Sequence, residues 1–264
     1  MAARTKRRAN REGRMSLGAH LLELRRRLFI AAIGIILGAI AGWFLSDFVL
    51  DAIRGPITEV GQQQGRVASI NWDNIGGAFD LKVQIALTIG FVVSSPVWLY
   101  QIWAFLVPGL TRREKGYSVG FLGASIPLFL AGCVAGWYVL PHIVILLASF
   151  APSEDTNLIT ARGYYDFVLK LVLAVGIAFV LPVFLVLLNF VGVLSASAII
   201  KSWRLAILAI VLFTAIATPA ADPTAMILLA IPMVILFFAA YGVAWIHDWR
   251  VARAADRLDS ELAA

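Results

Sequence analysis

The chain has 264 residues, of which 61% are hydrophobic and only 14% are charged, and its mean hydropathy is +0.86. A soluble domain is about 45–50% apolar and about 25% charged, so these values exclude a disordered chain and indicate a membrane protein. The single cysteine, Cys133, excludes an intramolecular disulfide and a cysteine-based metal cage. The net charge is +6, and its meaning depends on where the charged residues lie along the chain.

A basic segment opens the chain, and apolar runs then alternate with polar connections. Residues 1–15 are interpreted as a basic, disordered cytoplasmic tail, with the true start at Met1 or Met15. A membrane domain over 16–246 follows, and 247–264 are a charged cytoplasmic tail. The apolar runs predict six transmembrane helices, at about 28–46, 83–107, 117–140, 167–189, 203–217 and 225–245.

The connections and prolines add detail to this helical plan. Residues 47–82 are predicted to form a long external loop. Pro141 is predicted to end the third span, with the apolar stretch 142–150 extending as an external helix. Because proline removes a backbone donor, kinks are expected inside four runs, although neighbouring helices can also satisfy the freed carbonyls. These prolines are Pro96, Pro127, Pro182 and Pro232.

Spans five and six are predicted to be short. The fifth run has 15 residues and would measure about 22 Å as a helix, and the turn sequence TPAADPT follows it at 218–224. So short a helix implies local thinning of the bilayer. The fold expected is therefore an all-α polytopic membrane protein, a cupped bundle of six helices, several of them kinked at proline.

The placement of charge predicts the orientation. In this six-span scheme, 17 of the 22 basic residues fall on the side that holds both termini. Cytoplasmic loops carry the excess of Lys and Arg, so both termini are expected in the cytoplasm of a bacterial-type cell membrane. Six tryptophans near span ends fit an interfacial belt: Trp43, Trp103, Trp137, Trp203, Trp245 and Trp249.

The predicted membrane interior lacks ionisable groups. No Asp, Glu, His or Arg lies in the middle of a span, and Lys170, the nearest case, can extend its ammonium outward. Intramembrane ionisable residues mark proton relays and ion pathways. Their lack disfavours an intramembrane enzyme and a six-span solute transporter or channel, although the latter remains the alternative reading. No catalytic residue, metal or cofactor is expected.

Two segments at the cytoplasmic edge carry the most specific patterns. In HLLELRRRL, at 20–28, His20, Glu23 and Arg27 share one helical face. In YQIWAFLVPGLTRREK, at 100–115, an aromatic span end meets a Pro-Gly break and a charged turn. The simplest reading is an interfacial amphipathic helix with a Glu23–Arg27 pair, followed by an interfacial anchor.

Together with LLAIP, at 228–232, these two segments resemble the TatC family, the six-span component of the twin-arginine protein translocase. The resemblance covers about 16–246. It implies a receptor for twin-arginine signal peptides and export of folded proteins by the proton-motive force. It also implies assembly with single-span partners of the TatA and TatB type, with self-association in a larger complex in the lipid bilayer, and no nucleic-acid partner.

The family's signal-peptide-binding positions map onto Glu23, Phe105, Pro108 and Glu114. Carboxylates bind the planar donor forks of arginine in charge-assisted pairs, so the hypothesis is that Glu23 and Glu114 clamp the two arginines. Phe105 would supply an apolar contact beside them. The alternative is that each glutamate pairs only with a neighbouring arginine.

Four further positions are candidates for structural roles or partner contacts. Pro56 matches a family proline in the first external loop, and Thr218 lies at the external end of span five. Val180 and Phe238 stand where family members often carry acidic residues, in spans four and six. These two departures put in doubt any intramembrane carboxylate in partner docking.

Overall fold

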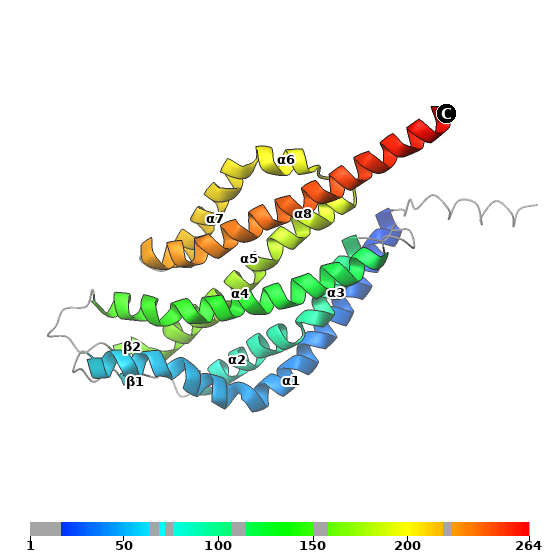
Figure 1. The fold of residues 1–264 in the computed structure, drawn as a ribbon. Coiled ribbons are helices and arrows are strands. Elements are labelled where there is room, and N and C mark those ends of the chain that lie inside the picture. Colours follow the sequence, from blue (N-terminus) through cyan, green and yellow to red (C-terminus); the bar gives the residue numbers. More distant parts are fainter. Residues whose placement is uncertain are drawn as a thin grey trace, which may run out of the picture. The chain divides into compact units, whose positions relative to one another are not determined.

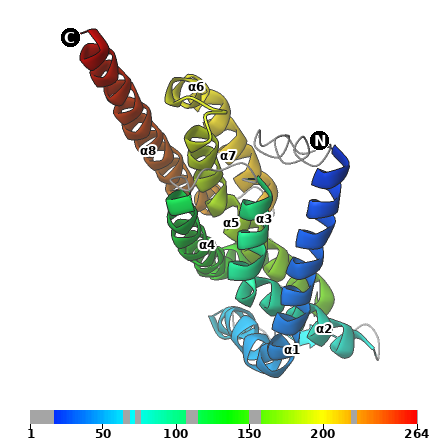
Figure 2. The same cartoon turned by 90° about the vertical axis from the view of Figure 1, so that its right-hand side faces the viewer.

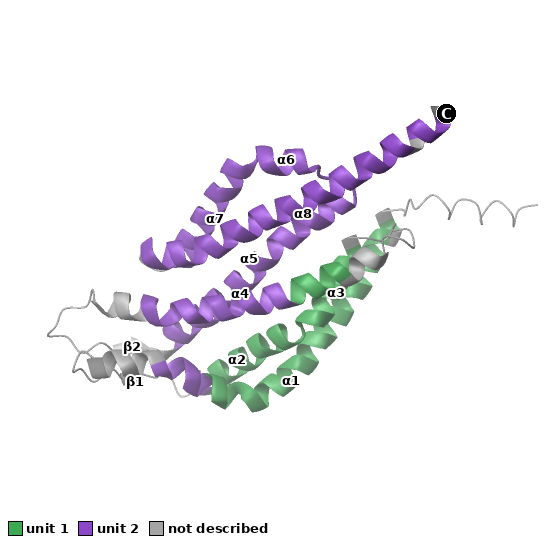
Figure 3. Ribbon diagram, in the orientation of Figure 1, with its two compact units in different colours: residues 1–49, 79–126 green, residues 50–78, 127–264 purple. Residues whose placement is uncertain are grey.

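The computed structural model describes residues 17–63, 69–71, 76–106, 115–149, 158–218 and 223–263, and nearly all of these are helical (Figure 1). The predicted tail at 1–15 lies outside the described residues. The chain divides into two compact units, which are coloured separately in Figure 3. Unit 1 consists of residues 1–49 and 79–126, and unit 2 of residues 50–78 and 127–264.

Eight helices and two short strands make up the described residues. The helices are α1 Leu17–Gln63, α2 Gly77–Val93, α3 Ser95–Leu106, α4 Lys115–Ser149, α5 Ala161–Phe190, α6 Ala196–Lys201, α7 Trp203–Ala217 and α8 Pro223–Ala263. The strands are β1 Ser69–Asn71 and β2 Leu158–Thr160.

The helices confirm a polytopic, all-helical membrane architecture. Four of the described helices, α1, α4, α5 and α8, are long and apolar enough to cross a membrane, and the bent pair α2–α3 could be a fifth span. The short apolar helix α7 has the bounds of the predicted fifth span. Each predicted span thus coincides with an apolar helix or helix pair, and the crossing of the membrane by α7 stays a prediction.

The second predicted span is broken beside Pro96, and α2 and α3 are bent there by 58°. Proline has no N–H to donate to the carbonyl four residues earlier, and its ring crowds that carbonyl, so the helix stops at Val93 and a new one starts at Ser95. The backbone N–H of Val97 instead donates to the carbonyl of Ser94 at 2.8 Å, in a tighter turn. The other predicted kink sites lie inside helices that continue past them, at Pro127, Pro182 and Pro232.

Helix α4 continues through Pro141 to Ser149, as expected if 142–150 extends the third span as an external helix, and the end of the span at Pro141 stays a prediction. The residues around this proline explain the continuation. Leu140 and Ile143 are 1% and 0% exposed, so packing within unit 2 holds the helix together where proline removes one backbone bond.

The long external loop predicted at 47–82 is wrong at both ends, since α1 continues to Gln63 and α2 begins at Gly77. The end of α1 is polar in sequence but has a buried side in unit 2. Ile53 is fully buried, and its carbonyl accepts a 3.0 Å hydrogen bond from the hydroxyl of Tyr164. Arg54 Nε donates to the hydroxyl of Tyr165 at 3.3 Å.

A two-stranded parallel sheet lies in the same unit. Strands β1 and β2 pair with Ser69 opposite Leu158, Ile70 opposite Ile159 and Asn71 opposite Thr160. Because β2 ends directly before α5, this pairing and the contacts of Tyr164 and Tyr165 fasten β1 and the last part of α1 to the start of α5.

In unit 1, α1 and α2 cross with their backbones almost in contact. A Cβ atom on Gly38 would lie 2.7 Å from the carbonyl oxygen of Gly90, and one on Gly42 would lie 2.4 Å from that of Ala86. Gly34, four residues before Gly38, faces Val97 of α3. Glycines spaced by four let membrane helices approach closely. Our sequence interpretation missed this spacing, although it is readable in the first span.

In unit 2, α5, α7 and α8 lie side by side in both views (Figure 1 and Figure 2). The hydrophobic core of unit 2 is built from buried residues of α4, α5 and α8. They are Val139, Ile143, Leu171, Val175, Ala178, Phe179, Ala225, Leu229 and Met233. Cys133 is buried at 7% exposure, and its sulfur packs against Gly176. Beyond the apolar part of α8, the charged segment predicted as a tail continues as helix to Ala263.

Candidate functional site

The first turns of α1 present their polar residues inward. His20, Glu23 and Arg27, the residues predicted to share a face, are all partly buried. Leu21 and Leu28, which lie outside this polar face, are 64% and 60% exposed. The polar face therefore packs against protein, while the leucines are left for an apolar environment such as lipid.

The predicted ion pair between Glu23 and Arg27 is present. Arg27 Nε donates to Glu23 Oε1 at 3.1 Å, and Arg27 Nη2 donates to the same oxygen. Both side chains are about one-fifth exposed, at 21% and 22%. The local alternative for Glu23 is thus observed, but it occupies only one carboxylate oxygen.

The second oxygen, Glu23 Oε2, is buried and accepts no hydrogen bond from the described residues. Buried polar atoms are nearly always paired, so an unpaired carboxylate oxygen is a candidate ligand contact. Since Oε1 already receives two donors from Arg27, Oε2 is the oxygen open to a further cationic donor.

Phe105, at the end of α3, lies against the start of α1. Its ring stacks on that of His20 with centroids 4.4 Å apart and planes at 24°. His20 precedes Glu23 by one helical turn on the same face, so the structure brings two predicted site residues, Glu23 and Phe105, to one place in unit 1. Pro108 and Glu114 lie outside the described residues, and the two-glutamate clamp stays a prediction.

Sequence reasoning missed two aromatic features of this site. It assigned no role to His20, although the helical spacing with Glu23 was visible. It also placed Trp103 in the interfacial belt, whereas Trp103 is only 8% exposed and its buried Nε1 has no described hydrogen-bond partner. The position of Trp103 at a predicted span end did not reveal this burial.

The candidate partner-contact residues differ in accessibility. Val180 is 3% exposed in α5, and Thr218 is 2% exposed with its hydroxyl donating to the carbonyl of Thr214 at 2.8 Å. Phe238 is 40% exposed on α8. Pro56 falls within α1, and its side chain lies outside the described part. Of the three described side chains, only Phe238 is open to a partner or to lipid.

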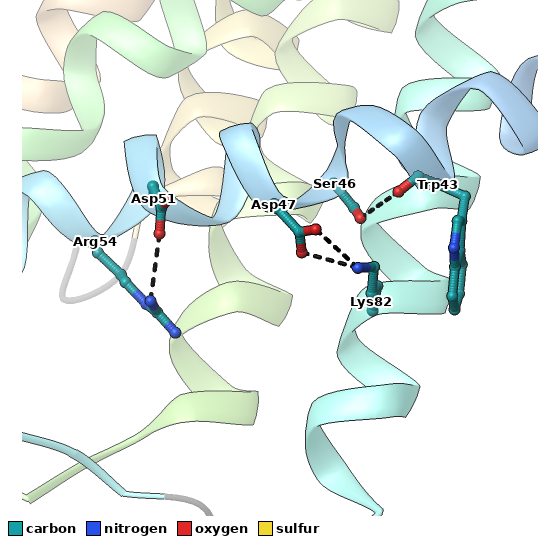
Figure 4. Close-up of polar contacts among 6 residues, drawn as sticks. All are labelled: Trp43, Ser46, Asp47, Asp51, Arg54 and Lys82. Atoms are coloured by element: carbon teal, nitrogen blue, oxygen red, sulfur yellow. Dashed lines mark hydrogen bonds and ion pairs between the residues drawn. The ribbon is translucent and has the colours of Figure 1, made fainter.

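At the other end of the first span, Lys82 of α2 is fastened to α1 (Figure 4). Its Nζ lies 2.9 Å from each carboxylate oxygen of Asp47 and 5.2 Å from the ring centroid of Trp43. In unit 2, Arg54 Nη1 donates to Asp51 at 3.3 Å, also shown in Figure 4.

Across the described ranges, no group of three or more His, Cys, Asp or Glu side chains could hold a metal ion.

Comparison with known proteins assigns the family. The profile of the family described as "Sec-independent protein translocase protein (TatC)" matches residues 19–232. The chain is 43% identical to the TatC of Xylanimonas cellulosilytica, covering 92% of this chain and 88% of that protein. It is 39% identical to the TatC of Rothia mucilaginosa, covering 92% and 84% respectively.

A solved structure agrees with these relatives. A crystal structure described as the twin arginine translocase receptor TatC superposes with a TM-score of 0.70 at 29% identity, covering 86% of this chain and 98% of that chain. Family membership also makes the chain a component of a protein translocase rather than an enzyme. With matches over nearly the whole chain in sequence and structure, this protein belongs to the TatC family of membrane-embedded, Sec-independent protein translocase components.

Proposed function

We propose that this chain binds twin-arginine signal peptides at its cytoplasmic face and passes folded proteins to an export complex driven by the proton-motive force. In this proposal all six apolar segments cross the membrane and both termini are cytoplasmic, as the distribution of 17 of the 22 basic residues favours. The likeness to a solved twin arginine translocase receptor supports the assignment.

The observation that carries the proposal is the buried, unpaired Oε2 of Glu23. Arg27 donates twice to Oε1, which fixes the carboxylate plane and leaves one oxygen for an incoming guanidinium. A charge-assisted pair there would be stronger than a neutral hydrogen bond because the partly buried site excludes water.

The stacked rings of His20 and Phe105 supply the second element. An arginine guanidinium is planar and weakly hydrated, so it stacks on aromatic faces more readily than a lysine ammonium does. A carboxylate beside an aromatic surface therefore favours arginine over lysine. We infer that Glu114 completes the clamp on the second arginine.

Assembly with TatA- and TatB-type single-span proteins and with further copies of the chain forms the rest of the proposal. Val180 is buried within unit 2. We infer that partners contact apolar surfaces such as that around Phe238, rather than a carboxylate in span four. The alternative of a six-span solute transporter or channel requires a polar site at mid-depth, which the predicted spans do not provide, and the family assignment opposes it.

Site-directed photocrosslinking and affinity measurement test this function. A photoreactive residue at Leu24, beside the carboxylate but leaving it intact, is expected to label a twin-arginine signal peptide and to label its Lys-Lys variant weakly. Glu23→Gln should raise the Kd of the twin-arginine peptide about tenfold or more, because a charged hydrogen bond is worth about 1.5–3 kcal/mol. Glu261→Gln, on the exposed end of α8, is the matched control.

Two results would contradict the proposal. One is equal labelling of the twin-arginine and Lys-Lys peptides from position 24. The other is an unchanged peptide Kd in Glu23→Gln when the variant unfolds at the same temperature as the parent chain.

A further inference from the structure

Helix α8 has two distinct faces along its apolar part. Along one face, residues spaced by three and four positions are buried in unit 2. They are Ala225, Leu229, Met233, Phe237, Ala240 and Ala244. The opposite face is not packed against protein. Four of its side chains are 40–61% exposed: Ile231, Ile235, Phe238 and Trp245. In a membrane protein an apolar helix face of this kind borders lipid.

The exposed face continues past the apolar part and becomes cationic. Trp249 is 44% exposed on this face, one turn after Trp245. Arg250, Arg253 and Arg257 follow at i, i+3 and i+7, so they share one stripe of the helix, and all three are exposed. Apolar residues, tryptophan and arginine thus succeed one another along the same side of α8.

The acidic residue beside this stripe faces elsewhere. Asp248 directs its carboxylate toward α6, where Oδ2 accepts a 2.8 Å hydrogen bond from the backbone N–H of Ala196. Among the described residues, none of the three arginines forms an ion pair, although Asp256 lies on the same helix. Their guanidinium donors therefore remain available to an anionic ligand.

Trp249 orders one of these arginines. The guanidinium carbon of Arg253 lies 3.8 Å from the centroid of the Trp249 ring, which is a close cation–π contact. This contact holds the guanidinium over the indole ring and restricts its motion. A guanidinium held in this way loses less conformational freedom when it binds a planar or tetrahedral oxyanion.

We propose that Trp249, Arg250, Arg253 and Arg257, named here the α8 arginine face, bind the phosphate groups of anionic phospholipids. Tryptophan marks the boundary between hydrocarbon and headgroups, and basic clusters directly after a membrane helix attract anionic lipid. Arg250 and Arg253 lie within about 6 Å of Trp249 along the helix axis, the depth of one headgroup layer.

A lipid fits this face better than an acidic protein segment. The arginine stripe is continuous with the exposed apolar face of α8, so an acyl chain can lie along Ile235 and Trp245 while the phosphate meets Arg250 and Arg253. This inference depends on the membrane location of the family and not on the proposed binding of signal peptides. Its test contains no peptide substrate, so the two proposals can fail separately.

Native mass spectrometry of the full chain in detergent provides the test, with phosphatidylglycerol and phosphatidylcholine of matched acyl chains as the probes. The parent chain should retain phosphatidylglycerol in preference to phosphatidylcholine. Each arginine near a surface is worth roughly fivefold in affinity. The triple variant Arg250→Gln/Arg253→Gln/Arg257→Gln should therefore lose phosphatidylglycerol binding by roughly a hundredfold, with phosphatidylcholine binding unchanged.

Matched controls separate local binding from net charge. The triple variant Lys6→Gln/Arg7→Gln/Arg8→Gln removes the same charge and should bind phosphatidylglycerol as the parent chain does. Trp249→Leu should weaken phosphatidylglycerol binding by a few-fold, because an unstacked Arg253 is less ordered. Thermal unfolding of each variant checks that the fold is retained.

Three outcomes would overturn the assignment. Equal loss in the two triple variants would mean that only net charge matters. Complete displacement of the lipid by millimolar glycerol 3-phosphate would identify a site for free phosphate. Tighter, arginine-dependent binding of a polyglutamate peptide would identify an acidic protein as the ligand of the α8 arginine face.

Discussion

The carboxylate of Asp248 accepts a 2.8 Å hydrogen bond from the side-chain amide of Asn189, which lies 59 residues earlier in the chain. Its other oxygen accepts from the backbone N–H of Ala196 at 2.8 Å. The same amide nitrogen of Asn189 also donates to the carbonyl of Leu194 at 2.9 Å. One carboxylate therefore fastens the end of α5 and the start of α6 to α8.

We expect Asp248→Ala to destabilise unit 2 by about 1 kcal/mol, because the backbone N–H of Ala196 loses its acceptor. The loss should fall below the range for hydrogen bonds to charged groups, since the Asp248 side chain is 38% exposed. Asp248→Asn should lose less, because an amide oxygen can still accept one of the two bonds. Thermal unfolding in detergent measures both.

Asp256→Ala, which removes an exposed carboxylate of the same helix, is the control and should unfold like the parent chain. Equal unfolding temperatures for Asp248→Ala and Asp256→Ala would show that the three-way contact contributes nothing to stability.

The crossing of α1 and α2 gives a second prediction. In Gly90→Ala the new Cβ would lie 2.4 Å from the backbone nitrogen of Ala39, closer than any real contact, so the two helices must separate. Overpacking of this kind costs about 1–3 kcal/mol. The unfolding temperature in detergent should fall clearly, and Gly38→Ala should act in the same direction, because its Cβ would meet the carbonyl oxygen of Gly90 at 2.7 Å.

Gly123→Ala is the matched control for Gly90→Ala. Gly123 lies in the membrane helix α4, and its added Cβ would meet nothing within 4 Å. The control should unfold at or slightly above the temperature of the parent chain. If Gly90→Ala did the same, the close approach of α1 and α2 would be refuted.

A third prediction concerns Lys82, Asp47 and Trp43 in unit 1. The ion pair is largely exposed, with side-chain exposures of 32% for Lys82 and 72% for Asp47, so Lys82→Met should cost only about 0.2–1 kcal/mol. Lys82→Glu should cost more, because two carboxylates then face each other, and adding Asp47→Lys should restore stability. If adding Asp47→Lys to Lys82→Glu did not raise the unfolding temperature, a direct ion pair between the two residues would be refuted.

The local parts of the fold could be predicted from the sequence. The 15 residues of α7 form a mostly apolar run, with Arg204 at its start, between a serine and a turn sequence, so its bounds were readable. The Glu23–Arg27 pair follows from i,i+4 spacing on any helix. Pro96 breaks its span because proline lacks the N–H that would bond to the carbonyl four residues earlier.

Contacts between distant segments could not be predicted in this way. Residues 47–63 look like a loop in composition, and they are helical because Ile53 meets Tyr164, which lies 111 residues further along the chain. Likewise, periodicity placed His20 and Glu23 on one face but carried no information about Phe105. Burial of a polar face at the start of α1 is a tertiary effect that overrides the amphipathic pattern.

The stacked pair of His20 and Phe105 supports a final prediction about peptide binding. If the two rings act together beside Glu23, His20→Ala and Phe105→Ala should each raise the Kd of a twin-arginine peptide several-fold. The double variant should then lose less binding free energy than the sum of the losses in the two single variants. Stacked aromatic pairs contribute about 0.5–1.5 kcal/mol beyond buried area, so the coupling energy in a double-mutant cycle should fall in that range.

The ring pair Trp43 and Phe79 serves as the control cycle, with centroids 6.0 Å apart beside the Lys82 ion pair. Trp43→Leu and Phe79→Leu should leave the peptide Kd unchanged, since they lie at the opposite end of the first span from Glu23. A coupling energy near zero for His20 and Phe105 would mean that the rings stack without forming a shared binding surface. The same coupling in both cycles would mean that peptide affinity reports only the stability of unit 1.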